Sequence, residues 1–242
     1  MSTLRALTRD PLGRRGFLKL AGAAGLGAFA LSQLPALGAL AQSDEQVADI
    51  VNVAATAEAL AVTLTGAVVA GAGRYDGGKG LPDMVVRWVK GIQAEEQAHY
   101  AYLLAAGAKP LTTTFTIPTN LAPITNDSKA LLDFVVSAET IFIAAYTAAA
   151  ERFAGLNQPD LSRVALQIAG VECEHRVLAN WARGASPPND IAFEKALFSS
   201  VGEAAAAVKG LGLLGAPNPA ATLSYADFAG KVDNTGVSNL TP

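Results

Sequence analysis

The pattern of apolar and polar positions divides most of the chain into four long helical stretches. The first is rich in alanine, valine and leucine, and the first and third carry few charges between their ends. Helices of about 24–29 residues are roughly 36–44 Å long at 1.5 Å per residue. The stretches cover about residues 47–72, 82–107, 127–154 and 159–183. The residues expected to begin them are the capping-box run Ser43–Gln46, Pro82, Asn126 or Asp127, and Pro159.

The connections between the stretches predict how the helices pair. Short loops join the first stretch to the second and the third to the fourth, so each pair is expected to be an antiparallel hairpin. About 19 residues, 108–126, join the second stretch to the third, and at ~3.3 Å each they can cross the length of the domain. Part of this connection, Thr112–Ile117, favours a strand. The predicted fold class is all-α, a four-helix bundle with one long crossover between helices two and three.

Residues 1–41 are expected to be an export signal and not part of the fold. Arg14 and Arg15 are followed by an apolar, glycine- and alanine-rich run and by a small-x-small cleavage site that ends at Ala41. These features resemble a twin-arginine signal, which implies the twin-arginine export machinery as a partner and a periplasmic or secreted protein. The alternative is an uncleaved membrane anchor.

We expect the bundle to occupy residues 42–184, and a short C-terminal helical appendage, residues 185–242, to pack on it. A second alternative places the first and third helical stretches in a membrane, because each has an apolar run of about 17–24 residues. The second and fourth stretches carry too many polar residues to join them there.

Composition narrows the classes of function. Residues 1–41 hold 5 of the 18 basic and 1 of the 21 acidic residues, so the rest of the chain has a formal charge of −7. No basic stripe remains, and nucleic acid is not an expected partner. The single cysteine, Cys173, excludes an internal disulfide. Stability must come from packing or from a metal.

Each helical stretch carries a glutamate near its middle. Glu58 and Glu139 are the only charges in long apolar runs of the first and third stretches. Burying an unpaired carboxylate costs several kcal/mol, and four carboxylates together also repel one another. The carboxylates must therefore be neutralised by protons or by cations, and two divalent metal ions balance four of them.

The only two histidines of the chain each follow a glutamate by three positions, Glu96 before His99 and Glu172 before His175. On a helix these positions share a face, so each pair can point at one metal ion. A single glutamate precedes each pair by 33 to 38 residues, which makes the pattern an internal repeat. The predicted metal ligands are Glu58, Glu96, His99, Glu139, Glu172 and His175, a donor set that suits Fe or Mn.

On these motifs the chain resembles the ferritin-like superfamily, and more narrowly the exported ferritin-like proteins grouped with plant desiccation-related proteins. The resemblance covers about residues 44–183, with further likeness from Pro188 onward. It implies two Fe or Mn ions that react with O₂ or peroxide, as in a ferroxidase, peroxidase or manganese-catalase-like enzyme. One alternative is a non-enzymatic stress protein with a structural metal, and another is an interaction protein with an empty site.

Four residues near the motifs have further expected roles. Tyr146 lies on the same helix face as Glu139 and is expected to fill the core, to orient a ligand or to carry a radical. Glu95 and Glu174, which adjoin the two motifs, are expected to face solvent. Arg176 lies four residues after Glu172 and is expected to pair with it, at the surface or behind the site.

Three further residues are expected to act through packing. We expect Trp88 and Trp181 to fill the core, and Cys173 to pack against a neighbouring helix. The expected assembly is a monomer or homodimer.

Overall fold

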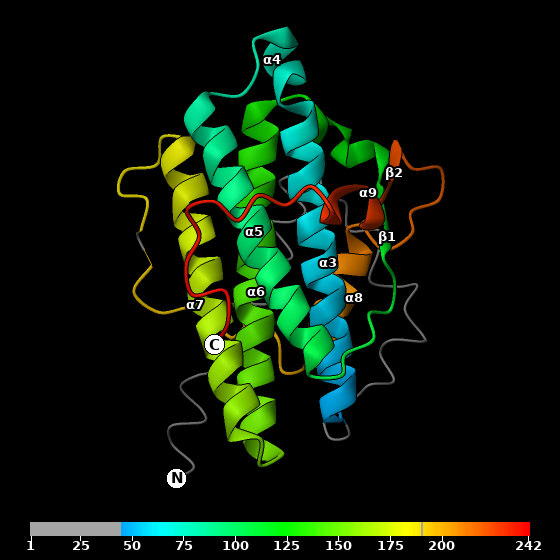
Figure 1. Cartoon of the computed structure of the whole chain (residues 1–242), viewed down its shortest axis with the longest axis vertical. Coiled ribbons are helices and arrows are strands. Elements are labelled where there is room, and N and C mark those ends of the chain that lie inside the picture. Colours follow the sequence, from blue (N-terminus) through cyan, green and yellow to red (C-terminus); the bar gives the residue numbers. More distant parts are fainter. Residues whose placement is uncertain (1–44, 190) are drawn as a thin grey trace.

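Four long helices form the bundle in the computed structural model, which describes residues 45–189 and 191–242 (Figure 1). The predicted export signal and the cleavage site at Ala41 lie outside the described residues. The fold is all-α with little strand, as predicted, and the long helices begin and end within a few residues of the expected positions. They are α3 (Val47–Gly71), α5 (Asp83–Ala105), α6 (Ser128–Gly155) and α7 (Pro159–Ala182).

Local chemistry accounts for the helix ends. The Gln46 backbone N–H donates to Asp49 Oδ2 at 3.0 Å at the start of α3, where a capping box was expected slightly earlier in the chain. Asp127 caps α6 by accepting a hydrogen bond from the Ala130 N–H at 2.7 Å, as predicted. Pro159 is the first residue of α7, where its missing N–H costs nothing.

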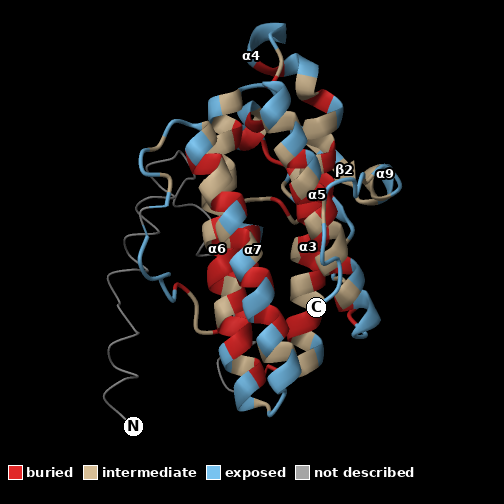
Figure 2. Cartoon of the chain, turned by 60° about the vertical axis from the view of Figure 1, so that its left-hand side comes forward, coloured by how far each residue is buried: buried red, intermediate tan, exposed pale blue. Residues whose placement is uncertain are grey.

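Short connections make two helical hairpins. α3 and α5 are joined through a 3-10 turn, η1 (Ala72–Arg74), and the single turn α4 (Tyr75–Gly78). Three residues join α6 to α7, and these two helices pack along their length. Figure 2 shows buried residues along the inward faces of α3, α6 and α7, so the core lies between the hairpins.

The long crossover contains regular structure of its own. The predicted strand forms as β1 (Thr114–Ile117), and a 3-10 helix, η2 (Thr119–Thr125), follows it. β1 pairs antiparallel with β2 (Ala221–Ser224) of the C-terminal segment, with Phe115 opposite Leu223. The sequence does not predict β2, because its alternation of apolar and polar residues covers only four positions, too few for a clear strand signal.

The C-terminal segment packs on the bundle. α8 (Val201–Gly210) lies against α3 and α6, and α9 (Ala226–Ala229) lies against α3. The buried Glu45 carboxylate accepts the N–H groups of Val201 and Gly202 at 3.3 and 2.6 Å, at the positive end of the α8 dipole.

Trp181 does not fill the core, contrary to the prediction. It is 49 % exposed, and its ring packs edge-on against Trp88 with 4.9 Å between the ring centroids. Trp181 lies in the last turn of α7, where the bundle ends and only one side of the ring is covered.

Two described helical segments, Val47–Gly78 and Ser128–Gly155, are long and apolar enough to cross a membrane by length and composition. In the most apolar 18-residue stretch of each segment, 50 % and 39 % of the residues are buried. Each segment also carries a buried glutamate, Glu58 or Glu139. The core helix of a soluble bundle has the same length and composition.

Candidate metal centre

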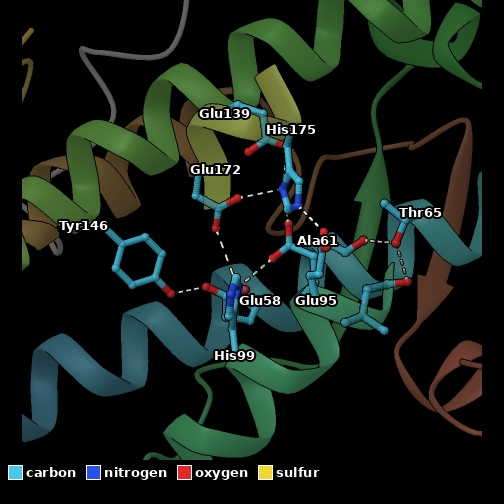
Figure 3. Close-up of polar contacts among 11 residues, drawn as sticks. Glu58, Ala61, Thr65, Glu95, His99, Glu139, Tyr146, Glu172 and His175 are labelled. Carbon is cyan, nitrogen blue, oxygen red and sulfur yellow. Dashed lines mark hydrogen bonds and ion pairs between the residues drawn. The ribbon is translucent and has the colours of Figure 1, made fainter. Parts of the chain in front are cut away.

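The six predicted ligands come together at one level of the bundle. α3 contributes Glu58, α6 contributes Glu139, and α5 and α7 each contribute a Glu-x-x-His pair. Antiparallel hairpins bring the middles of the helices to the same height, and the i, i+3 spacing turns each glutamate and histidine to one side. Figure 3 shows His99, Glu172 and His175 pointing toward one another between the helices.

The ligands form two groups that share two glutamates. Within each group, one oxygen or nitrogen atom of every residue lies within 4.8 Å of the corresponding atoms of the others. The groups are Glu58, Glu96, His99 and Glu172, and Glu96, Glu139, Glu172 and His175. Glu96 and Glu172 thus lie between two neighbouring candidate metal positions. We refer to the Glu58–His99 half and the Glu139–His175 half of the cluster.

Both histidines face the cluster with the same ring nitrogen. His99 Nδ1 lies 3.4 Å from Glu58 Oε2 and 3.6 Å from Glu96 Oε2. His175 Nδ1 lies 3.0 Å from Glu172 Oε2 and 3.3 Å from Glu96 Oε1. Because Nδ1 points inward in both rings, the Nε2 atoms point away from the cluster, and that of His175 meets Glu95.

Burial makes the cluster costly without cations. The four glutamates are between 0 % and 5 % exposed. Among the described residues, the buried side-chain atoms that lack a hydrogen-bond partner all belong to the predicted ligands: Glu58 Oε2, Glu96 Oε1 and Oε2, His99 Nδ1, Glu139 Oε2 and Glu172 Oε1. An uncompensated buried charge costs several kcal/mol. The donor set therefore fits metal ions as the missing partners of these atoms.

The pKa values of the cluster are displaced by the same burial. Burial and a neighbouring carboxylate raise the pKa of Glu58 and that of Glu139 well above their ordinary values. Burial alone would raise the pKa of Glu96, but hydrogen bonds with Glu58 and both histidines outweigh it and lower that pKa. Burial alone would lower the pKa values of His99 and His175, but the surrounding carboxylates raise both. The metal-free cluster thus retains protons that metal ions would replace.

Tyr146 lies beside the Glu58–His99 half. Its hydroxyl donates a hydrogen bond to Glu58 Oε1, and the whole side chain is buried (Figure 3). Burial, reinforced by the Glu58 carboxylate, raises the pKa of Tyr146 well above its ordinary value, so the phenol keeps its proton. The hydrogen bond occupies Glu58 Oε1 and leaves Oε2 facing His99.

The prediction that Glu95 faces solvent is wrong. Glu95 Oε2 lies 2.8 Å from His175 Nε2, and the side chain is 35 % exposed. α5 and α7 approach closely enough at this level for a glutamate on one helix to reach the histidine on the other. The position of Glu95 four residues before His99 points to a different histidine, so no signal in the sequence indicates this contact. A carboxylate at the outer nitrogen of a metal-binding histidine fixes the ring orientation and the tautomer.

Glu174 is exposed, as predicted, whereas Arg176 is buried and has a partner that the spacing does not predict. The Arg176 guanidinium donates through Nη1 to Glu194 Oε2 at 2.8 Å and through Nη2 to Glu194 Oε1. Cys173 Sγ lies 3.7 Å from the same carboxylate. This pair ties the segment after α7 to the helix that carries His175.

Comparison with known proteins gives one family for the range that holds the four long helices. Residues 46–185 match the family model described as a ferritin-like domain. A search of curated proteins and a search of solved structures each found no match. The matched range contains all four long helices and every predicted ligand.

Proposed function

Because the chain belongs to the ferritin-like domain family, we propose that its six clustered ligands bind two metal ions, iron or manganese. The observation that carries this proposal is the pair of overlapping groups, each with three carboxylates and one imidazole. Hard oxygen donors combined with imidazole suit both metals, and four carboxylates balance the charge of two divalent cations.

A bound pair of iron or manganese ions supplies the change of oxidation state needed to react with O₂ or peroxide. We propose such a reaction, of the ferroxidase, peroxidase or manganese-catalase-like type, as the function of the protein in stress protection. The residues of the chain then have distinct roles. Glu96 and Glu172 belong to both groups and would be shared by two bound ions, while each of the other four ligands would hold one ion.

Two residues outside the ligand set orient the ligands. The Tyr146 hydroxyl holds Glu58 by Oε1, so that Oε2 points to the cluster. Glu95 holds His175 by Nε2, so that Nδ1 points to the cluster. Burial of the four glutamates keeps bulk water from the reacting centre.

We also propose that the protein works in the periplasm or outside the cell, on the basis of Arg14, Arg15 and the apolar run after them. The test is fractionation of cells that express the whole chain. We expect the wild-type protein outside the cytoplasm. The variant with both arginines replaced by lysine should stay in the cytoplasm. Unchanged export of the double-lysine variant would contradict the twin-arginine assignment.

A second candidate is a metal pair that only holds the fold, and the near-complete burial of Glu58, Glu96, Glu172 and His175 favours it. Structural metal sites are closed and contribute directly to folding free energy. In that case removal of the metal lowers the melting temperature, while the loaded protein consumes neither Fe(II) nor peroxide beyond the rate of free metal.

The test of metal binding is the metal content of the protein folded in its native host. We expect about two metal ions per chain, and loss of both in Glu172→Ala, because Glu172 belongs to both groups. Glu174→Ala is the matched control, since it removes an exposed glutamate two residues away on the same helix.

Less than about 0.2 metal ions per chain in the wild type, or equal loss in both variants, contradicts metal binding. Fe(II) oxidation and peroxide consumption by the loaded protein then separate the redox reaction from the structural role.

A further inference from the structure

A large apolar cavity adjoins the cluster on the side of Glu139. Its volume is about 290 Å³, and both Glu96 and Glu139 line it. α3, α5 and α6 form most of the wall, and the crossover, α8 and β2 complete it with residues such as Ile117, Val208 and Leu223. The Tyr146 side of the cluster differs, because the cavity lined by Tyr146 measures about 40 Å³.

The cavity is elongated along the bundle. On α5 its lining extends from Val85 to Glu96, and on α6 it extends from Leu131 past Glu139 to Phe142; each span is about 16 Å at 1.5 Å per residue. An apolar cavity of about 150 Å³ takes up one benzene ring, so a volume near 290 Å³ holds about ten to twelve carbon atoms. Length and volume together fit one extended alkyl chain.

Between the two glutamates at one end and Arg74 at the other, the wall offers almost nothing to a polar substituent. The hydroxyl groups of its threonines and tyrosine are already bound to backbone carbonyls: Thr65 to Ala61 at 2.6 Å, Tyr75 to Ile124 at 2.8 Å, and Thr125 to Ala122 at 2.8 Å. A ligand with hydroxyl groups along its length would leave those groups unpaired, at a cost in affinity. The wall therefore selects a plain hydrocarbon chain.

The end of the cavity away from the cluster carries a cation. Arg74 lines the cavity there, is exposed, and forms no ion pair with any carboxylate of residues 45–189 or 191–242. It lies in η1, at the same end of the bundle as α4 (Figure 1). A guanidinium at the mouth of an apolar cavity suits the carboxylate head of a fatty acid.

We propose that this cavity binds a saturated, unbranched fatty acid of about ten to twelve carbons, with its carboxylate at Arg74 and its chain end beside Glu139. Any reaction at the end of the alkyl chain beside Glu139 rests on the proposed metal function. Binding itself does not, because the cavity wall is formed by protein side chains alone. The ligand class of the site is then a hydrocarbon chain and not a sugar, peptide or nucleotide.

The test is a titration of the purified whole chain with dodecanoate below its micelle concentration, followed by tryptophan emission. Trp88 lines the cavity, and the ring of Trp181 packs against the ring of Trp88. Both tryptophans of the chain therefore report on the cavity. We expect saturable binding of one dodecanoate per chain. Hexanoate, with six fewer methylene groups, should bind at least about 100-fold more weakly.

Paired variants of α3 locate the bound chain. Ala67 lines the cavity, whereas Ala70 is exposed on the same helix. Ala67→Phe should weaken dodecanoate binding at least about tenfold by filling the space, and Ala70→Phe should bind as the wild type does. Arg74→Gln should weaken dodecanoate binding about threefold, as for an exposed ion pair, and should leave dodecanol binding unchanged.

The absence of saturable binding to the wild type overturns the proposal, and this result does not depend on whether any variant folds. Equal weakening by Ala67→Phe and Ala70→Phe also overturns it. Metal content is measured on the same preparations. If the protein binds dodecanoate but contains no metal, the result supports the cavity proposal and counts against the metal function. If it contains metal but does not bind dodecanoate, the result supports the metal function and overturns the cavity proposal.

Discussion

The two halves of the cluster have the same kinds of ligand and different surroundings. In the Glu58–His99 half, Tyr146 binds the single glutamate, and His99 remains 13 % exposed. In the Glu139–His175 half, Glu95 binds the outer histidine nitrogen, and His175 is 1 % exposed. The large apolar cavity reaches Glu139.

This difference shows that the repeat in the sequence specifies the ligands and not their environment. The ligands come from equivalent positions of two helical hairpins. Their neighbours do not follow the repeat: Glu95, the partner of His175, lies on a helix of the other hairpin, and part of the cavity wall comes from the C-terminal segment. We therefore expect the two metal positions to differ in affinity and in access, and the following experiments test that difference.

The largest expected effect comes from removing the single glutamate of one half. Glu58→Gln and Glu139→Gln each take a carboxylate from one group only, so each should reduce the metal content from about two ions per chain to about one. The measurement is metal analysis of each purified variant. If either substitution empties both positions, the halves act as one unit and the comparison fails.

The second effect separates the halves by their neighbours. Glu95→Gln removes the charge beside His175, and loss of such a partner typically weakens metal binding about 10- to 100-fold. We expect this loss for one of the two ions in a competition with a chelator. Glu174→Gln is the control, because Glu174 is exposed and adjoins His175. If the affinity for both ions falls equally, Glu95 supports the whole cluster and not the Glu139–His175 half alone.

The third effect is a dependence of stability on pH in the metal-free protein. Folding raises the pKa values of four groups: Glu58, Glu139, His99 and His175. Their contribution to stability is complete when the pH is below their ordinary pKa values, which are 4.5 for glutamate and 6.5 for histidine. The contribution is lost as the pH rises toward the raised values. The lowered pKa of Glu96 acts only as the pH falls below 4.5. The melting temperature of metal-free protein should therefore fall as the pH rises above about 5.

The variants of the single glutamates sharpen this prediction. Glutamine keeps the shape of the protonated acid and cannot ionise, so Glu58→Gln and Glu139→Gln should each flatten the fall in melting temperature in metal-free protein. A change of about 1 kcal/mol corresponds to about 2–4 °C for a chain of this size. A melting temperature that rises with pH would contradict the assigned protonation states.

The smallest effect concerns Tyr146. Tyr146→Phe leaves all six ligands in place, so the metal content should stay at about two ions per chain, while the folded state loses about 1–2 kcal/mol with the buried hydrogen bond to Glu58. Chemical denaturation measures the loss. Tyr225→Phe is the control, because its hydroxyl binds Gln97 at 2.8 Å outside the ligand set. Only Tyr146→Phe should also change the affinity of the Glu58–His99 half.

The bundle and the clustering of the ligands could be predicted because they depend on local patterns and on burial. Helix lengths and caps follow from nearby residues, as at Asp127 and Pro159. Glu58 and Glu139 could be assigned to one site because an isolated charge in an apolar helix needs a partner in the core.

The surroundings of the site could not be predicted, because they depend on contacts between distant segments. Glu95 on α5 contacts His175 on α7, and the two residues are 80 positions apart in the chain. β2 forms because β1 offers it an edge, and its own residues do not favour a strand. The cavity is bounded by side chains of several helices and strands, and no local pattern records the space left between them.

The pairing of β1 with β2 also sets an order of events during synthesis. All six clustered ligands have emerged from the ribosome before Ala221–Ser224 is made, so the bundle can close around metal ions while one wall of the cavity is still missing. β2 can join β1 and complete that wall only after Ala221–Ser224 has been made. Metal ions that the clustered ligands take up before then would enter a domain whose cavity is still open on this side.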